Sequence, residues 1–118
     1  MINAVHLLRY SRDPVADRAF FRDILGWPWV EESATPGWLI FKLPPAEIGV
    51  HPTDDPPSTE LMLMCDDLEA TVAQLEAKGV EMTAPVTVEP YGRVTAFRLP
   101  GGGDVALYQP THETAHDL

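Results

Sequence analysis

The stretch ELMLMCDDLEATVAQLEAKG, from Glu60 to Gly79, carries the signals for a strand, a turn and a helix in that order. Its opening ELMLMC is an apolar run of strand length, and Asp66 or Asp67 then supplies the short acceptor side chain that caps a helix. Gly79 follows the last turn, where a glycine commonly ends a helix. We therefore predict a strand over 60–65 and a helix over 67–78. The apolar residues on one face of that helix are Leu68, Val72 and Leu75.

Three short segments rich in β-branched and aromatic residues follow this helix. They are VEMTAPVTV, GRVTAFRLP and DVALYQP. Gly101 to Gly103 separate the last two segments, and because a strand and not a helix comes next, we predict a hairpin turn rather than a phosphate-binding loop. Residues 60–110 are thus expected to form a βαβββ unit.

Residues 1–52 repeat the same order. VHLLRYS is a predicted strand, and Asp13 with Pro14 begins a helix in which Phe20 and Ile24 lie four residues apart. Gly26 ends that helix, and WPWVEE, GWLIFKLP and AEIGVHP follow as strand candidates. This repetition indicates an internal duplication within one domain of 118 residues. The expected parts are repeat one at about 1–52, a connector at 53–59, repeat two at about 60–110 and a flexible tail at 111–118.

A four-stranded sheet with a single helix has one covered face and one bare face. Two such bare faces must bury each other or enclose a ligand, either within one chain or across a dimer. Because the chain is short and leaves open sheet edges, we expect a homodimer.

The net charge of −10 lies almost entirely in the second half of the chain. Residues 1–52 hold five basic and six acidic side chains, whereas residues 53–118 hold three basic and twelve acidic side chains. Such a field repels phosphate backbones, which argues against nucleic-acid binding, and it favours metal cations or cationic ligands. No apolar run is long enough to span a membrane and no signal-peptide core is present, so we expect a cytoplasmic protein with no membrane partner.

The single cysteine, Cys65, excludes an internal disulfide and lies in an apolar run, where a buried and reduced thiol is expected. The motif HETAH, His112 to His116, matches the HExxH pattern of zinc proteases. Pro110 separates it from the preceding segment and only two residues follow it, too few for a stable helix or a third zinc ligand. We therefore expect no stable helix beyond Pro110.

Four segments together resemble the vicinal oxygen chelate superfamily, which includes glyoxalase I, fosfomycin-resistance enzymes, extradiol dioxygenases and bleomycin-resistance proteins. The resemblance extends from Ala4 to Pro110 and implies an α+β fold. In it, two βαβββ repeats form a cupped, mostly antiparallel, eight-stranded sheet. The segments are FFRDILGW at 20–27, ELMLMCDDLEAT at 60–71, YGR at 91–93 and ALYQP at 106–110.

The same resemblance implies a metal site inside the cup, with ligands from the first and last strands of each half. The matching positions are His6, Glu47 and Glu60, and Ala106 stands where the family has a glutamate. One imidazole and two carboxylates suit Mn, Fe, Ni or Zn. Each residue also has a simpler interpretation, because His6 can be a core or cleft histidine and the two glutamates can be exposed strand-end acids. The predicted ligand-binding residues are His6, Trp38, His51, Tyr91, Arg93 and Asp104.

Two functions remain open from the sequence. One is a small-molecule-binding protein with weak or no native metal binding, whose acidic, aromatic-lined cleft takes a cationic or aromatic ligand. The alternative is a divalent-metal-dependent lyase or isomerase of the glyoxalase I type, acting on a small vicinal-oxygen substrate with Glu47 or Glu60 as the catalytic base. Ala106 and the glutamate at position 60, where histidine is usual, favour the binding protein.

Overall fold

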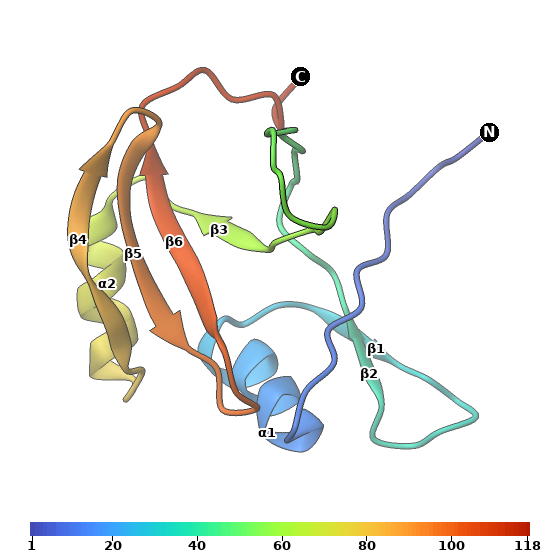
Figure 1. Ribbon diagram of the computed structural model, residues 1–118. Coiled ribbons are helices and arrows are strands. Elements are labelled where there is room, and N and C mark those ends of the chain that lie inside the picture. Colours follow the sequence, from blue (N-terminus) through green and yellow to red (C-terminus); the bar gives the residue numbers. More distant parts are fainter.

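The computed structural model describes residues 1–118 as a mixed α+β fold with two helical segments and six strands in two sheets (Figure 1). The first helical segment changes from an α-helix, α1, to a π-helical turn, η1. None of the helices is both long and apolar enough to cross a membrane. The elements are α1 (Pro14–Ala19), η1 (Phe20–Ile24), β1 (Trp29–Glu31), β2 (Leu39–Phe41), β3 (Met62–Met64), α2 (Leu68–Ala77), β4 (Met82–Glu89), β5 (Gly92–Arg98) and β6 (Asp104–Pro110).

Both predicted helices are confirmed, together with the residues that begin and end them. The Asp13 carboxylate accepts a hydrogen bond from the backbone N–H of Ala16 at 3.0 Å, and Asp67 does the same for Ala70 at 3.1 Å. Gly79 follows α2 with a φ of +83°, in the left-handed region that favours glycine. Local capping and glycine signals therefore determine where these helices lie.

Repeat two forms a four-stranded sheet with the order β3-β6-β5-β4. The β4–β5 and β5–β6 pairs are antiparallel, and β3 pairs with β6 in parallel. Helix α2 covers one face of this sheet, and Phe20 from η1 joins the same core by stacking on Phe97 with ring centroids 5.8 Å apart (Figure 1). The core residues are Phe20, Leu68, Leu75, Val80, Phe97, Leu99, Val105 and Leu107.

Of the four strands predicted for repeat one, only two form, as the antiparallel ribbon β1–β2. The expected count of eight strands is therefore not confirmed. The segments VHLLRYS and AEIGVHP, predicted as its outer strands, have no regular structure. A strand requires a neighbour for its backbone N–H and C=O groups, and these two segments have none in the chain. Residues 1–10 instead run away from the four-stranded sheet (Figure 1, dark blue). The exposed apolar residues of the two segments include Val5, Leu8, Tyr10, Ile48 and Val50.

The single chain is also less compact than a folded domain of its length. Its radius of gyration is 15.4 Å, against about 13.5 Å expected for 118 residues. Its accessible surface is 8930 Å², whereas a monomer of this mass exposes about 6,300 Å². One chain therefore exposes roughly 2,600 Å² more surface to solvent than a compact monomer of the same mass would.

A buried carboxylate ties the N-terminal segment to the β5–β6 hairpin. Asp17 on α1 is 3% exposed, and its carboxylate accepts hydrogen bonds from the Gly101 backbone N–H at 2.7 Å and from Arg9 Nε at 3.0 Å. The backbone N–H of Arg12 donates to the Gly101 carbonyl at 3.0 Å. A Cβ on Gly101 would lie 1.9 Å from Ser11 Oγ, so no side chain fits there. We call these contacts the Asp17 clasp.

Candidate ligand-binding site

The face of the four-stranded sheet opposite α2 is open and apolar. Val105, Leu107 and Phe97 point into the core beneath α2, so strand alternation places Ala106 and Tyr108 on the other face. The register sets Met62 and Met64 of β3 beside them, and Ala96 and Val94 of β5 on their other side. We call this surface the open face. Its residues are Met62, Met64, Ala84, Val94, Ala96, Ala106 and Tyr108.

Aromatic rings gather at one end of the open face. Tyr91, in the β4–β5 turn, meets Tyr108 edge to face with ring centroids 5.5 Å apart. Nε2 of His112 lies 3.1 Å from the Tyr108 hydroxyl oxygen. The close approach of the turn to β6 depends on Gly92, because a Cβ there would lie 2.2 Å from the Gln109 carbonyl oxygen. The turn and the strand end thus hold two tyrosines and a histidine together.

Glu47 adds a carboxylate beside these rings. Its Oε1 accepts hydrogen bonds from the backbone N–H groups of Ala115 at 3.0 Å and His116 at 3.3 Å, so it holds the C-terminal segment in place. Burial raises the pKa of Tyr108, and the negative charge of Glu47 raises it further. The Tyr108 hydroxyl is therefore neutral at physiological pH and able to donate a hydrogen bond. We call Glu47, Tyr91, Tyr108 and His112 the aromatic corner.

A sequence model of the glyoxalase/bleomycin resistance protein/dioxygenase superfamily matches residues 3–107, nearly the whole chain. The chain belongs to this superfamily. Its predicted resemblance to the vicinal oxygen chelate proteins is thereby confirmed. No curated protein matches it by sequence.

Solved structures of the superfamily share its fold. TnmS3, an antibiotic binding protein from Streptomyces sp. CB03234, superposes with a TM-score of 0.66 at 26% identity, over 93% of this chain and 98% of that chain. Lactoylglutathione lyase from Agrobacterium tumefaciens gives a TM-score of 0.63 at 20% identity, over 92% and 94% of the two chains. A superfamily member from Sphaerobacter thermophilus DSM 20745 gives 0.60 at 21% identity, over 92% and 98%. The similarities to the last two structures, at 20% and 21% identity, show a shared fold only.

The predicted metal ligands of this superfamily member do not meet within one chain. His6 lies in the exposed N-terminal segment, Glu60 is exposed ahead of β3, and Glu47 holds backbone N–H groups of the tail. No three side chains of the His, Cys, Asp or Glu type are close enough together to hold a metal ion. Ala106 occupies the middle of the open face, beside Met62. The donor set of a single chain therefore does not fit a divalent metal.

Among the predicted ligand-binding residues, only Tyr91 lies at the aromatic corner. His51 is exposed in the irregular segment 46–52. The Arg18 guanidinium lies over the Trp38 ring, 5.4 Å from the ring centroid. Arg93 pairs with Glu69 on the α2 side of the sheet. Asp104 accepts a hydrogen bond from Arg98 Nε at 3.3 Å.

Tyr108 and His112 were not predicted as site residues from the sequence. The alternation of side chains along a strand could have identified Tyr108, because it lies two residues after Ala106 and therefore on the same face of the sheet. His112 belongs to the HETAH segment, which forms no helix beyond Pro110, as predicted. That segment turns back toward Glu47, a long-range contact without any local signal.

Cys65, just after β3, is expected to react slowly with alkylating reagents. Burial raises the pKa of its thiol, and the nearby carboxylates of Asp66, Asp67 and Glu69 raise it further. At pH 7 we expect iodoacetamide to modify Cys65 several-fold more slowly in the folded protein than in urea, as followed by intact mass. Equal rates in the two states would show that the thiol is not protected.

Proposed function

We propose that the protein binds an aromatic or cationic small molecule on the open face, against the aromatic corner, without a native metal. The observation that carries this proposal is the composition of the face, where Ala106 stands at a ligand position of the superfamily and methionine, valine and tyrosine side chains surround it in place of carboxylates and imidazoles. Apolar surface with a few polar groups at one end is the usual composition of a small-molecule site.

The charge and the aromatic groups support this class of ligand. Tyr91 presents an exposed ring that packs edge to face on the buried ring of Tyr108, and Glu47 places a negative charge near them. A cation over a tyrosine ring is attracted by its quadrupole, and a net charge of −10 raises the local concentration of cations. The likeness to TnmS3, which is an antibiotic binding protein, agrees with a binding role.

We also propose that the protein works as a homodimer whose second copy covers part of the open face. The excess surface of about 2,600 Å² per chain is near the upper part of what obligate homodimers bury, roughly 1,000 to 2,500 Å² or more per partner. The segments 4–10 and 46–52 form no strand within the chain, although their sequences are strand-like and carry exposed apolar residues. A strand of the partner could form backbone hydrogen bonds with either of them.

Replacing Tyr108 by alanine is expected to weaken the binding of an aromatic cation such as ethidium by about tenfold, because the exposed Tyr91 ring loses the buried ring that holds it edge to face. Tyr108→Phe keeps the ring and should bind within about twofold of the wild type, since only the hydroxyl is removed. Isothermal titration calorimetry measures both affinities, and circular dichroism checks that each variant is folded. Equal binding by wild type and Tyr108→Ala would contradict the proposed location.

The same preparations distinguish the proposed binding protein from a metal-dependent lyase. We expect substoichiometric Mn, Fe, Ni and Zn by elemental analysis after purification without added metal. We also expect ethidium affinity to be unchanged by EDTA. Stoichiometric metal, with loss of binding on chelation, would instead support the lyase or isomerase.

A further inference from the structure

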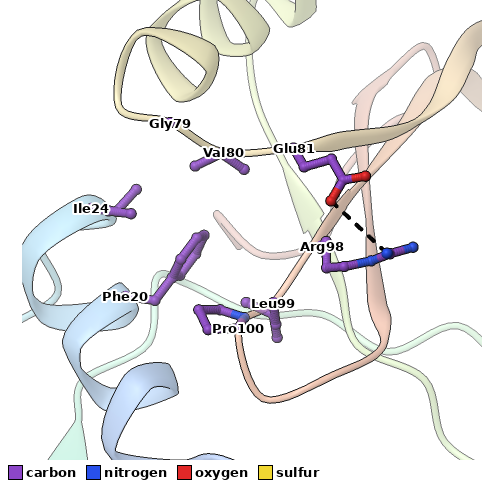
Figure 2. Close-up of a pocket in the computed structure, with 8 residues that line it drawn as sticks. All are labelled: Phe20, Ile24, Gly79, Val80, Glu81, Arg98, Leu99 and Pro100. Carbon is purple, nitrogen blue, oxygen red and sulfur yellow. Dashed lines mark ion pairs between the residues drawn. The ribbon is translucent and has the colours of Figure 1, made fainter.

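Two hollows flank the first helical segment, and only one of them offers exposed side chains to a ligand. The first lies between η1, the end of α2 and the end of β5 (Figure 2). Phe20, Val80 and Leu99, which line it, are buried core residues, so a ligand would find little free surface there. The second hollow lies between α1 and the turn that joins β1 to β2, and its volume is about 440 Å³, within the range of small-molecule pockets. We call it the α1 cleft, and its residues include Val15, Arg18, Ala19, Pro36, Gly37 and Trp38.

One wall of the α1 cleft is the side of α1 that is turned away from the core. Val15, Arg18 and Ala19 share this side because they lie about one helical turn apart. The opposite side of the helical segment carries Asp17 and Phe20, which are buried. Val15 is 72% exposed and Arg18 is half-buried, so this wall presents an aliphatic surface beside a guanidinium group.

The other wall is the turn between β1 and β2. Trp38 is 56% exposed there, beside Pro36 and Gly37. The backbone N–H of Gly37 donates to Glu31 Oε1 at 2.7 Å, and the backbone N–H of Trp38 donates to the Thr35 carbonyl at 3.1 Å. These hydrogen bonds hold the turn, so the indole ring projects from a fixed backbone.

Arg18 joins the two walls and has no carboxylate partner. Its guanidinium lies over the Trp38 ring, and its Nη1 makes only a long hydrogen bond, of 3.5 Å, to the Gly37 carbonyl. None of the ion pairs in the chain includes Arg18. A guanidinium presents its N–H donors in a planar fork that matches a carboxylate. Most of the Arg18 donors therefore remain available to a ligand.

The other charges around the cleft are already engaged. Arg22, which also lines the cleft, donates two hydrogen bonds to the Asp23 carboxylate at 2.7 and 2.8 Å. Glu31 and Glu32 accept backbone N–H groups of the turn at 2.7 and 3.1 Å, and neither lines the cleft. At physiological ionic strength, exposed charges more than about 8 Å away are largely screened. Arg18 is therefore the unpaired charge of this hollow.

We propose that the α1 cleft is a second ligand site, which takes a small aromatic carboxylate. The carboxylate accepts hydrogen bonds from the Arg18 guanidinium, and the aromatic ring packs against Trp38 and Val15. A cation of the same shape is disfavoured, because both charged side chains that line the cleft are arginines. This site is separate from the open face and does not depend on the function proposed for that face.

The ligands 2-naphthoate and 2-naphthamide test the proposal, because they share a ring system and nearly the same shape but differ in charge. Two-dimensional ¹⁵N NMR of the full-length protein follows the amides of Val15 and Gly37 and the indole N–H of Trp38. We expect 2-naphthoate to shift these signals in a saturable manner. It should bind about fivefold more tightly than 2-naphthamide, since only the carboxylate pairs with Arg18. The amides of Met62 and Met64 report any binding to the open face separately.

Three variants assign the binding to the cleft. Arg18→Gln should lower the affinity for 2-naphthoate about fivefold, to that for 2-naphthamide, because the ion pair is lost. Arg12→Gln removes an exposed arginine just before α1 and outside the cleft, and it should leave both affinities unchanged. Trp38→Ala removes the aromatic wall and should weaken both ligands about tenfold. Circular dichroism checks that each variant is folded.

Three results would overturn this second site. They are the absence of saturable shifts at the cleft signals, equal affinities of the wild type for the two ligands, and undiminished 2-naphthoate binding by Arg18→Gln. Because Tyr108 lies away from the cleft, Tyr108→Ala should leave the cleft shifts intact. Failure of the cleft site and failure of the open-face site are therefore distinguishable.

Discussion

Replacing Asp17 by alanine is expected to lower the free energy of unfolding by about 3 kcal/mol. The carboxylate is 3% exposed and accepts hydrogen bonds from the Gly101 backbone N–H and from Arg9 Nε. Its removal leaves a buried N–H group without a partner and separates a half-buried guanidinium from its counter-charge. Urea unfolding followed by tryptophan fluorescence measures the change.

Two further variants test whether the Asp17 clasp is the cause. Gly101→Ala should destabilise the protein comparably, because its Cβ would lie 1.9 Å from Ser11 Oγ and 2.5 Å from the Asp17 carboxylate. Asp23→Ala removes an acidic residue of the same helical segment that pairs only with Arg22 at the surface, and it should cause no resolvable change. If Asp17→Ala unfolds at the same urea concentration as the wild type, the clasp does not hold the N-terminal segment in solution.

The second large effect concerns assembly. At micromolar concentration we expect sedimentation to give twice the 13.0 kDa of one chain. Leu8→Asp should raise the dimer dissociation constant by about a hundredfold or more, because it places an unpaired charge where the partner is expected to pack. Leu8 is 72% exposed in the single chain, so the substitution should not disturb the fold of one copy.

Gln74→Asp is the matched control for this experiment. It adds the same charge on the exposed side of α2, away from the open face, and should leave the dimer intact. A wild-type protein that sediments as a single chain would contradict the proposed dimer. A dimer that Leu8→Asp does not weaken would show that the partner packs elsewhere.

The sequence by itself determined the features that depend on neighbours in the chain. The caps at Asp13 and Asp67 and the glycine at 79 could be predicted because each acts within one turn of helix. The hairpin at Gly101 to Gly103 followed from glycine spacing between two strand-like segments. The four motifs between residues 20 and 110 were sufficient to predict the superfamily to which the chain belongs.

Only the tertiary structure decided which strands form and which residues meet. Residues 4–10 and 46–52 have strand-like sequences, yet they form no strand because a strand exists only when another backbone pairs with it. The aromatic corner depends on register and turn geometry, which bring Tyr91 to Tyr108 across a hairpin. Glu47 was predicted on a strand that does not form, and its carboxylate instead accepts hydrogen bonds from backbone N–H groups 68 and 69 residues away. Such long-range contacts are selected by the packing of the whole chain, and no local pattern encodes them.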